Sequence, residues 1–401
     1  MNIDDMNSKK QKYYEIKSWE DKDLNLSAGL LRGIYSHGFE DPSPIQKSVV
    51  YTMGKYTNKE GKYCDILAQA QSGTGKTGAF TISTLCRYEN FNDKDKILVI
   101  APTHELARQI SNEYKALGQY LKIKVALLIG GTPVDNDRRF LEKNNPPVIV
   151  GTPGRIQDII RRKYLKPDDI KVLVIDEVDE MLSQGFRAQM YEILSIMNEN
   201  IQIGLFSATL PPQVLEITNG FLHEPAKILV KTEQLTLQGI EQCFLNVSDD
   251  TNKFENIKKL FSVISLNQTL IYCNSVRRVD ELHEAMICDG FPVNKIHGKL
   301  TTNEREEISK KFKNGEFRIL ICTDMYARGI DVQQVSLVIN FDIPKNVSTY
   351  LHRIGRSGRW GRKGKAINFQ TRYDIYKIKH LEQYYDTQIK ELPSNWAEYL
   401  D

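Results

Sequence analysis

The chain has 401 residues, a length that favours two or three domains over one. Apolar residues make up 41% and charged residues 26%, which is the composition of a globular protein and excludes a disordered or low-complexity chain. The sequence contains no apolar run long enough for a membrane span, and its first residues lack the apolar core of a secretory signal. We therefore expect no contact with a membrane and a cytoplasmic location, with the nucleus left open.

The net charge of +3 is unevenly distributed along the chain. Residues 1–240 carry 30 basic and 30 acidic side chains, whereas residues 241–401 carry 24 basic and 21 acidic side chains. Eight basic residues and no acidic residue lie between Ile343 and Tyr373. Such a cluster is either a solvated basic face or a site for phosphate groups.

Six cysteines are scattered through the sequence without a CxxC pair. Several of them lie inside apolar runs, as in TLIYC and RILICT. We expect most of them to be reduced, buried and structural, and we do not expect a metal site formed by cysteines.

The N-terminal region, residues 1–37, reads as an extension whose first residues are frayed. Its later part, LSAGLLRGIYSHG (26–38), has the spacing of an amphipathic helix. Residues 38–231 then alternate short apolar runs with longer amphipathic stretches, the pattern of a parallel sheet with crossover helices. The expected strands are CDILA (64–68), KILVIAP (96–102), VALLIGG (125–131), PVIVGTP (147–153), VLVID (172–176) and IGLFSAT (203–209).

The same pattern restarts after a polar stretch that we interpret as a linker at 232–240. The expected strands of this second domain, residues 241–401, are QCFLNV, TLIYC, VNKIHG, RILICT, LVINFD and KAINFQ. Helical patterns separate them, including SVRRVDELHEAMICDG and TTNEREEISKKFKNG. The fold class is therefore α/β, with two domains that are each a mostly parallel sheet flanked by helices.

The first expected strand runs into the glycine-rich sequence AQSGTGKT and then into a helical pattern. Glycines in such a turn let backbone N–H groups point at phosphate oxygens, and the helix N-terminus adds partial positive charge. Lys76 would reach the β and γ phosphates, and the Thr77 hydroxyl would hold Mg²⁺. Ala70 stands where the general P-loop pattern has glycine, so a plain glycine-rich turn is the alternative. The candidate phosphate-binding residues are Ala70, Gln71, Ser72, Gly73, Thr74, Gly75, Lys76 and Thr77.

Two acidic residues follow the strand VLVID and complete this candidate nucleotide site. Asp176 would bind Mg²⁺ through water, and Glu177 would orient and deprotonate the attacking water. Acidic residues at a strand end can also be simple solubilising caps. Their occurrence together with a P-loop favours the catalytic interpretation.

Ten motifs in one order give the sequence a family resemblance. They are GFEDPSPIQ, AQSGTGKT, APTHELA, GG, TPGR, DEVD, SAT, YCNS, TDMYARGID and HRIGRSGR. The chain resembles the DEAD-box ATP-dependent RNA helicases from about Trp19 to Leu400. The resemblance implies two RecA-like domains that close on each other when ATP and RNA are bound.

The resemblance also implies roles for single residues of the ATP site. Gln46 would bind the adenine edge and Phe39 its face, and Trp19, two residues farther upstream than the family's usual aromatic, is a weaker candidate. The other implied roles are coupling for Asp179, Ser207 and Thr209, ribose binding for Asp331, and arginine fingers for Arg356 and Arg359. His352 and Arg353 belong to the same motif as these arginines.

An RNA site is implied across both domains by small residues, backbone amides and helix starts. Such groups bind phosphates and sugars, so binding is expected to be largely independent of base sequence. Contacts to 2′-hydroxyls would select RNA. For each residue alone, a turn or a helix cap is an equally good interpretation. The implied residues are Thr103, His104, Gly131, Thr152, Gly154, Arg155, Asn274, Gly298, Thr323 and Arg328.

Three positions depart from the family pattern. Val178 replaces the usual alanine of DEAD, and we expect it to pack inward and leave turnover intact. His104 replaces an arginine, which removes a permanent charge from a place expected to face RNA. Thr302 stands where glutamine is usual, which leaves the RNA contact of the second domain open.

The leading functional hypothesis is an RNA-dependent ATPase that unwinds short duplexes. An ATP-gated RNA clamp that nucleates an assembly needs the same motifs and stays open as an alternative. A DNA translocase is disfavoured, because GFEDPSPIQ and HRIGRSGR resemble the RNA branch. Translation initiation, a monomeric state, and a scaffold or regulatory protein as partner are implied by resemblance alone.

Overall fold

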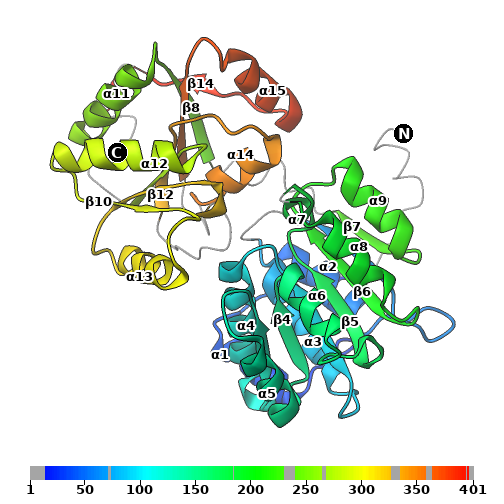
Figure 1. Ribbon diagram of the computed structural model, residues 1–401. Helices are drawn as coiled ribbons and strands as arrows, with labels where there is room; N and C mark the ends of the chain where they lie inside the picture. The colour runs from blue at the N-terminus through cyan, green and yellow to red at the C-terminus, as the bar shows by residue number, and fades with distance from the viewer. Residues whose placement is uncertain are drawn as a thin grey trace. The chain divides into compact units, whose positions relative to one another are not determined.

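The computed structural model describes residues 14–70, 74–183, 185–229, 240–263, 268–326, 335–357, 364–393 and 395–396. The described residues form two compact units, the first ending at 229 and the second starting at 240 (Figure 1). This arrangement confirms the predicted α/β fold class with two sheets. The predicted linker lies outside the described residues except for Ile240, and the predicted domain boundaries stay predictions.

The first unit is built on a seven-stranded parallel sheet with the strand order β3-β4-β2-β5-β6-β1-β7. Its strands are β1 (Ile66–Gln69), β2 (Lys96–Ile100), β3 (Val125–Leu128), β4 (Val148–Gly151), β5 (Ile170–Ile175), β6 (Gln202–Ser207) and β7 (Ala226–Leu229). Its helices are α1 (Ala28–Ser36), α2 (Pro44–Gly54), α3 (Lys76–Tyr88), α4 (His104–Leu117), α5 (Val134–Asn144), α6 (Pro153–Arg161), α7 (Val178–Ser183), α8 (Arg187–Ser195) and α9 (Pro212–Phe221). Short 3₁₀ turns occur at Gln119–Leu121 and Pro167–Asp169.

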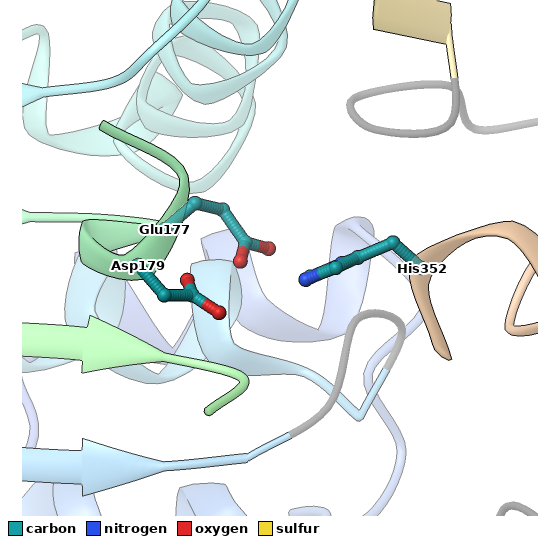
Figure 2. A group of neighbouring side chains, drawn as sticks. All are labelled: Glu177, Asp179 and His352. Atoms are coloured by element: carbon teal, nitrogen blue, oxygen red, sulfur yellow. The ribbon is translucent and has the colours of Figure 1, made fainter. Parts of the chain in front are cut away.

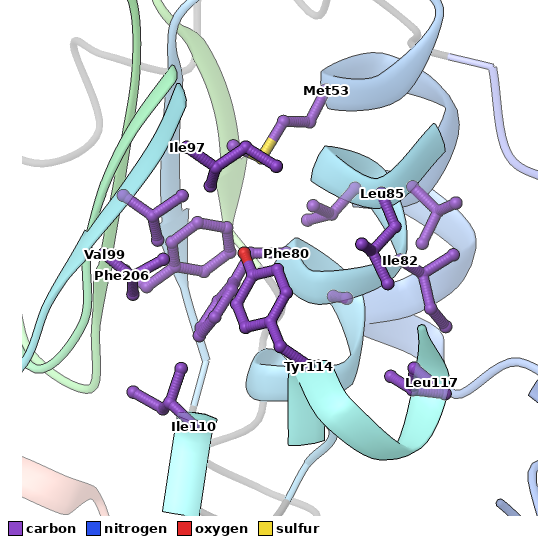
Figure 3. Close-up of a cluster of buried hydrophobic side chains, with 14 of the residues drawn as sticks. Met53, Phe80, Ile82, Leu85, Ile97, Val99, Ile110, Tyr114, Leu117 and Phe206 are labelled. Carbon is purple, nitrogen blue, oxygen red and sulfur yellow. The ribbon is translucent and has the colours of Figure 1, made fainter. Parts of the chain in front are cut away.

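Two hydrophobic cores cover the two faces of this sheet, because successive side chains of a strand point to opposite faces. On β2, Ile97 and Val99 join one core, whereas Leu98 and Ile100 join the other. Helices α1 to α4 contribute to the first core and α5 to α9 to the second. Figure 3 shows part of the first core, where the rings of Phe80 and Phe206 have centroids 5.1 Å apart.

The second unit repeats this plan with a seven-stranded parallel sheet of order β10-β11-β9-β12-β13-β8-β14. Its strands are β8 (Ile240–Asn246), β9 (Gln268–Tyr272), β10 (Val293–Ile296), β11 (Ile319–Cys322), β12 (Val335–Asn340), β13 (Gly364–Gln370) and β14 (Lys390–Glu391). Its helices are α11 (Asp250–Val263), α12 (Val276–Cys288), α13 (Thr302–Lys313), α14 (Val347–Ile354) and α15 (Ile375–Tyr385), with a 3₁₀ turn at Asp324–Tyr326.

The sequence predicted six strands for each sheet, and the structure adds one short edge strand to each. β7 alternates buried and exposed residues, and both residues of β14 are exposed. Neither strand has the continuous apolar run that identified the others. Each of them is an edge strand that pairs with one neighbour only. An edge strand is less buried than a central strand, so it can form without a continuous apolar run.

The parallel arrangement has a direct consequence for the site. The carboxyl ends of parallel strands meet at one edge of a sheet, and residues that follow those ends gather there. Most of the motifs predicted from the sequence follow the carboxyl ends of strands, whereas GFEDPSPIQ (38–46) precedes β1 and HRIGRSGR begins on α14. Among the residues that the structure describes, no helix is both long and apolar enough to cross a membrane.

All six cysteines lie in the described segments and form no disulfide, as predicted, and Cys288 is exposed.

Candidate functional site

The turn between β1 and α3 forms the first part of the candidate nucleotide site. Gly75 precedes α3 with φ of +98°, a left-handed conformation that suits glycine. Lys76 and Thr77 open the helix, and Lys76 is buried. The predicted residues Gln71, Ser72 and Gly73 lie outside the described residues. The described part of the turn therefore has the glycine conformation and the helix start of a phosphate-binding loop.

A buried group of acidic residues follows the carboxyl end of β5 and faces Lys76. Asp176, Glu177 and Asp179 are all buried, and Lys76 Nζ lies 3.2 Å from Glu177 Oε1. Figure 2 shows the carboxylates of Glu177 and Asp179 projecting from the segment that begins α7; His352, drawn with them, belongs to the second unit. Glu177 has φ of +51°, an uncommon conformation for a residue with a side chain. A backbone outlier of this kind is typical of a functional site.

The electrostatics of this group set Asp176 apart. Burial, together with the negative charge of Glu177, raises the pKa of Asp176 to about 7, although Lys76 opposes the shift. Asp176 Oδ1 accepts a hydrogen bond of 3.0 Å from the backbone N–H of Glu177. Burial and the charge of Glu177 therefore disfavour the ionised form of Asp176 more than Lys76 favours it.

The three predicted coupling residues meet in one hydrogen-bonded group within the first unit. The Thr209 hydroxyl donates to Asp179 Oδ2 at 2.6 Å, and its backbone N–H donates to the same oxygen at 3.2 Å. The backbone N–H of Asp179 donates to Ser207 Oγ at 3.3 Å. The segment after β6 is therefore tied to the start of α7.

Val178 lies between the acidic residues and is fully buried in the second core of this unit. The prediction that it packs inward is confirmed. Its effect on turnover stays a prediction.

Gln46 and Phe39, the predicted adenine contacts, lie beside the start of α3. Gln46 Nε2 donates to the Gly75 carbonyl at 3.4 Å, and Gln46 Oε1 accepts from the Ser43 backbone N–H at 2.8 Å. A Cβ atom at Gly78 would lie 2.8 Å from both Gln46 Nε2 and the Phe39 ring. Glycine at position 78 therefore permits this close approach of α2 to α3.

Trp19, the weaker candidate for covering the base, is buried. Its side chain is 1% exposed and belongs to the first core of the unit, together with Ile16 and Leu24. Almost no ring surface is left to cover a base.

The predicted RNA-binding residues of the first unit follow three neighbouring strands, β3, β4 and β2. Gly131 and Gly154 are exposed, and a Cβ atom at either would meet nothing within 4 Å. Thr103 caps α4 by accepting from the backbone N–H of Leu106, and Thr152 is the N-cap residue of α6. The His104 ring lies close to the loop after β3, because a Cβ atom at Gly130 would be 3.3 Å from its Nε2.

Arg155, another predicted RNA contact, has protein partners for its side chain. Its buried guanidinium pairs with Asp137 and donates to the Thr132 carbonyl at 2.6 Å and to the Thr132 hydroxyl at 3.3 Å. Arg155 thereby joins α6 to the loop that carries Gly131. No local sequence pattern points to Asp137, because this partner of Arg155 lies 18 residues away on another helix.

In the second unit, Asn274, Gly298 and Thr323 follow the carboxyl ends of the neighbouring strands β9, β10 and β11. Asn274 is held in place by its side chain, since Nδ2 donates to the Ile343 carbonyl at 2.9 Å. Thr302 begins α13. The predicted residues Arg328, Asp331 and Arg359 lie outside the described residues.

Arg353 is the central cation of the second unit and is fully buried on α14. It donates to Asp324 Oδ1 at 2.5 Å, to the Asp342 carbonyl at 2.6 Å and to Asn274 Oδ1 at 2.7 Å. Arg356 follows the same helix and is buried as well.

The sequence reasoning missed Asp342, which organises charge at the same edge. Arg278 donates to both of its carboxylate oxygens at 2.7 Å, and Lys253 Nζ lies 3.1 Å away. Burial alone would raise the pKa of Asp342, but Arg278 and Lys253 outweigh it and lower that pKa below its usual value. The available signal was the same as for Asp176, an acidic residue at the end of an apolar strand, here LVINFD.

Comparisons with known proteins agree with this geometry. The profile of the DEAD/DEAH box helicases matches residues 43–217, and that of the helicase conserved C-terminal domain matches residues 252–361. The eukaryotic initiation factor 4A of Caenorhabditis elegans is 48% identical over 380 residues, which cover 94% of this chain and 92% of that protein. This chain belongs to the DEAD-box family of ATP-dependent RNA helicases.

Further relatives of this DEAD-box chain support the assignment. The ATP-dependent RNA helicase eIF4A of Yarrowia lipolytica is 48% identical over 378 residues, which cover 94% of each chain. The solved structure of Dbp5 from S. cerevisiae bound to RNA and ADP BeF3 has a TM-score of 0.85 at 31% identity, covering 96% of this chain and 98% of that chain. Mss116p bound to single-stranded RNA and AMP-PNP has a TM-score of 0.83 at 27% identity, covering 98% and 82%. The RecA-like fold expected of each half is confirmed.

Proposed function

We propose that this DEAD-box helicase is an RNA-dependent ATPase that separates short RNA duplexes by ATP-driven closure of its two units, and that it acts in translation initiation in the cytoplasm. The observation that carries the proposal is the buried group of Lys76, Asp176 and Glu177 beside the turn after β1. The eIF4A relatives support the biological process.

In this proposal, the ion pair between Lys76 and Glu177 exchanges partners when ATP binds. Lys76 turns to the β and γ phosphates, which frees the Glu177 carboxylate for the attacking water. The water oxygen bonds to the γ phosphorus, the bond to the bridging oxygen of ADP breaks, and Glu177 accepts the proton. The 3.2 Å contact keeps both groups within reach of one site before the exchange.

Mg²⁺ fits the donor set of the first unit. The Asp176 carboxylate and the Thr77 hydroxyl are oxygen ligands of the kind that Mg²⁺ prefers. The pKa of Asp176 is raised by burial and by the neighbouring charge of Glu177, and a divalent cation would favour the ionised form of this carboxylate. When bound, the ion would neutralise charge on the β and γ phosphates.

The second unit would complete the reaction through its basic residues. Arg356 and Arg359 are the proposed arginine fingers, and Asp331 is the proposed ribose contact. The buried network around Arg353 supports this role, because it fixes the helix from which Arg356 extends.

RNA is proposed to bind through its sugar-phosphate backbone at the carboxyl edges of both sheets. The exposed glycines and the helix starts at these edges support binding without base recognition. A monomeric state and a scaffold or regulatory protein as partner belong to the same proposal.

The test is the ATPase rate of the full chain with and without single-stranded RNA. The proposal expects stimulation by RNA and little by matched DNA, and an RNA-independent rate would contradict it. RNA release after hydrolysis then separates the two modes of action: rapid release favours unwinding, and slow release favours a clamp.

A further inference from the structure

The last described helix of the second unit, α15, packs one face against the core. Ile378, Leu381 and Tyr385 are buried in a cluster with residues of β8, β13 and α14. The Tyr385 hydroxyl also donates to the Val347 carbonyl at 2.7 Å. These contacts fix the helix, coloured red in Figure 1, on the unit and determine which side chains face solvent.

The opposite side of the helix exposes aromatic rings. Tyr373, just before the helix, is 67% exposed, and Tyr376 and Tyr384 are 68% and 50% exposed. Tyr376, His380 and Tyr384 are spaced four residues apart, so they follow one another along the same side of the helix. With a rise of about 1.5 Å per residue, this row is about 12 Å long. We call Tyr373, Tyr376 and Tyr384 the tyrosine ridge.

Basic side chains accompany the ridge. The Arg372 guanidinium carbon lies 4.6 Å from the centroid of the Tyr373 ring, and Lys377 Nζ lies 5.9 Å from that of Tyr376. Lys379 is exposed on the same helix. Lys377 pairs with Asp374 at 2.8 Å, so these two charges offset each other, and Glu382 accepts from the Ile389 backbone N–H at 2.8 Å. Arg372 and Lys379 are the remaining cations beside the ridge.

The exposed rings are suited to a ligand with flat apolar faces, and the neighbouring cations are suited to a ligand with negative charge. Large aromatic side chains are usually buried, and three in one short segment form an unusual surface. Tyrosine rings interleaved with cations match single-stranded nucleic acid, whose bases stack on the rings while its phosphates meet the cations.

The start of the ridge lies at the sheet edge that carries predicted RNA-binding residues. Arg372 and Tyr373 follow the carboxyl end of β13, the same edge that carries Asn274 and Thr323. Only β12 separates β13 from β9 in the strand order, a distance of about 10 Å.

We propose that the tyrosine ridge is an accessory site for single-stranded RNA. The site is additional to the motifs described above, and it rests on the proposed function only in that RNA is the ligand. Its contribution is to hold RNA that extends beyond the site formed by those motifs, so affinity depends on RNA length.

The experiment compares two oligouridylates with the full-length protein and a non-hydrolysable ATP analogue. One RNA has about 8 nucleotides, enough for the motifs alone, and the other has about 40 nucleotides, enough to reach the ridge as well. Tyr376→Ala lowers affinity for the long RNA by about fivefold, and adding Tyr384→Ala lowers it by about twentyfold or more. Affinity for the short RNA and the ATPase rate that it stimulates are unchanged.

Conservative and matched control variants test whether the aromatic rings of the ridge cause the loss of affinity for the long RNA. Phenylalanine at both positions retains the rings and keeps wild-type affinity for the long RNA. Tyr35→Ala, which removes a 44% exposed ring whose hydroxyl donates to Glu20, has no effect. Lys379→Glu weakens binding of the long RNA and flattens its salt dependence.

Unchanged affinity of the double alanine variant for the long RNA would overturn the proposal. A ridge that binds a protein and not RNA would give this same result. Failure of the proposed function is a different result. It would show as an absence of RNA-stimulated ATPase in the wild type, whereas failure of the ridge leaves that ATPase intact.

Discussion

The carboxyl edges of the two sheets carry charged groups in opposite electrostatic conditions. In the first unit, Asp176, Glu177 and Asp179 are buried around one lysine, and the pKa of Asp176 rises to about 7. In the second unit, Asp342 is flanked by Arg278 and Lys253, and its pKa falls below the usual value.

This difference indicates two roles for buried charged groups. Those of the first unit are suited to binding a charged ligand, whereas those of the second unit stabilise the fold. Buried charges that neutralise each other fix a geometry, as the network of Arg353 does for α14. Buried charges that remain uncompensated cost stability and are typical of catalytic sites. This contrast supports the proposal that the acidic residues of the first unit take part in ATP hydrolysis and that α14 of the second unit presents a preorganised arginine.

The largest effect is expected for Arg356→Ala. If Arg356 stabilises charge on the transferred phosphate, its loss lowers kcat by about 10³–10⁵-fold. Nucleotide affinity of the first unit is unchanged, which equilibrium binding of a fluorescent ATP analogue measures. Arg277→Ala, an exposed arginine of the same unit paired with Glu281, is the control and keeps wild-type turnover. An Arg356→Ala rate within tenfold of wild type would remove this residue from the reaction.

Glu177→Gln is expected to lower turnover by about 10²–10⁴-fold, because the carboxylate proposed to accept the proton is lost. ATP and RNA binding are retained, since the residue is assigned to the water and not to the phosphates. Lys76→Ala is the contrasting variant and weakens nucleotide binding itself. Steady-state ATPase assays with direct binding measurements separate the two variants, and full activity of Glu177→Gln would exclude its role as the base.

Gln46→Ala is expected to reduce the preference for ATP over GTP by roughly 10- to 100-fold, because buried hydrogen bonds to the adenine edge contribute about 1–3 kcal/mol. The ratio of kcat/KM for the two nucleotides measures this preference. If the wild-type protein uses GTP as efficiently as ATP, Gln46 does not select adenine and the proposed contact is wrong.

The elements predicted from the sequence share a strong local signal. The core strands have apolar runs buried on both faces, and helices such as α13 begin at a capping residue, here Thr301 with Glu304. The edge strands β7 and β14 lack such runs because they are short and partly exposed.

The parts of the site that the sequence did not reveal depend on contacts between distant residues. The pairing of Arg278 with Asp342 joins residues 64 positions apart, and Arg155 was predicted to contact RNA without any sign of its partner Asp137. The left-handed backbone of Glu177 is set by the surrounding fold and not by local preference. Motifs predict which residues act, whereas the balance of charge around those residues can be described only from the structure.

Thermal unfolding of Asp176→Asn and Asp342→Asn at pH 8, in a chelator without nucleotide, tests the contrast between the two edges most directly. A raised pKa means that the contribution of Asp176 to stability is present below its unfolded pKa and is lost as pH rises through about 7. Asp176→Asn removes that cost at pH 8 and raises the melting temperature by a few degrees, a gain that shrinks towards pH 5.

Asp342 has the opposite sign, because a lowered pKa stabilises the folded state at every pH above its unfolded value. Asp342→Asn therefore lowers the melting temperature at both pH 8 and pH 5. A rise for Asp176→Asn with a fall for Asp342→Asn is the result that our account predicts. A fall for both variants would show that the carboxylates of the first unit are as fully compensated as those of the second, and would contradict it.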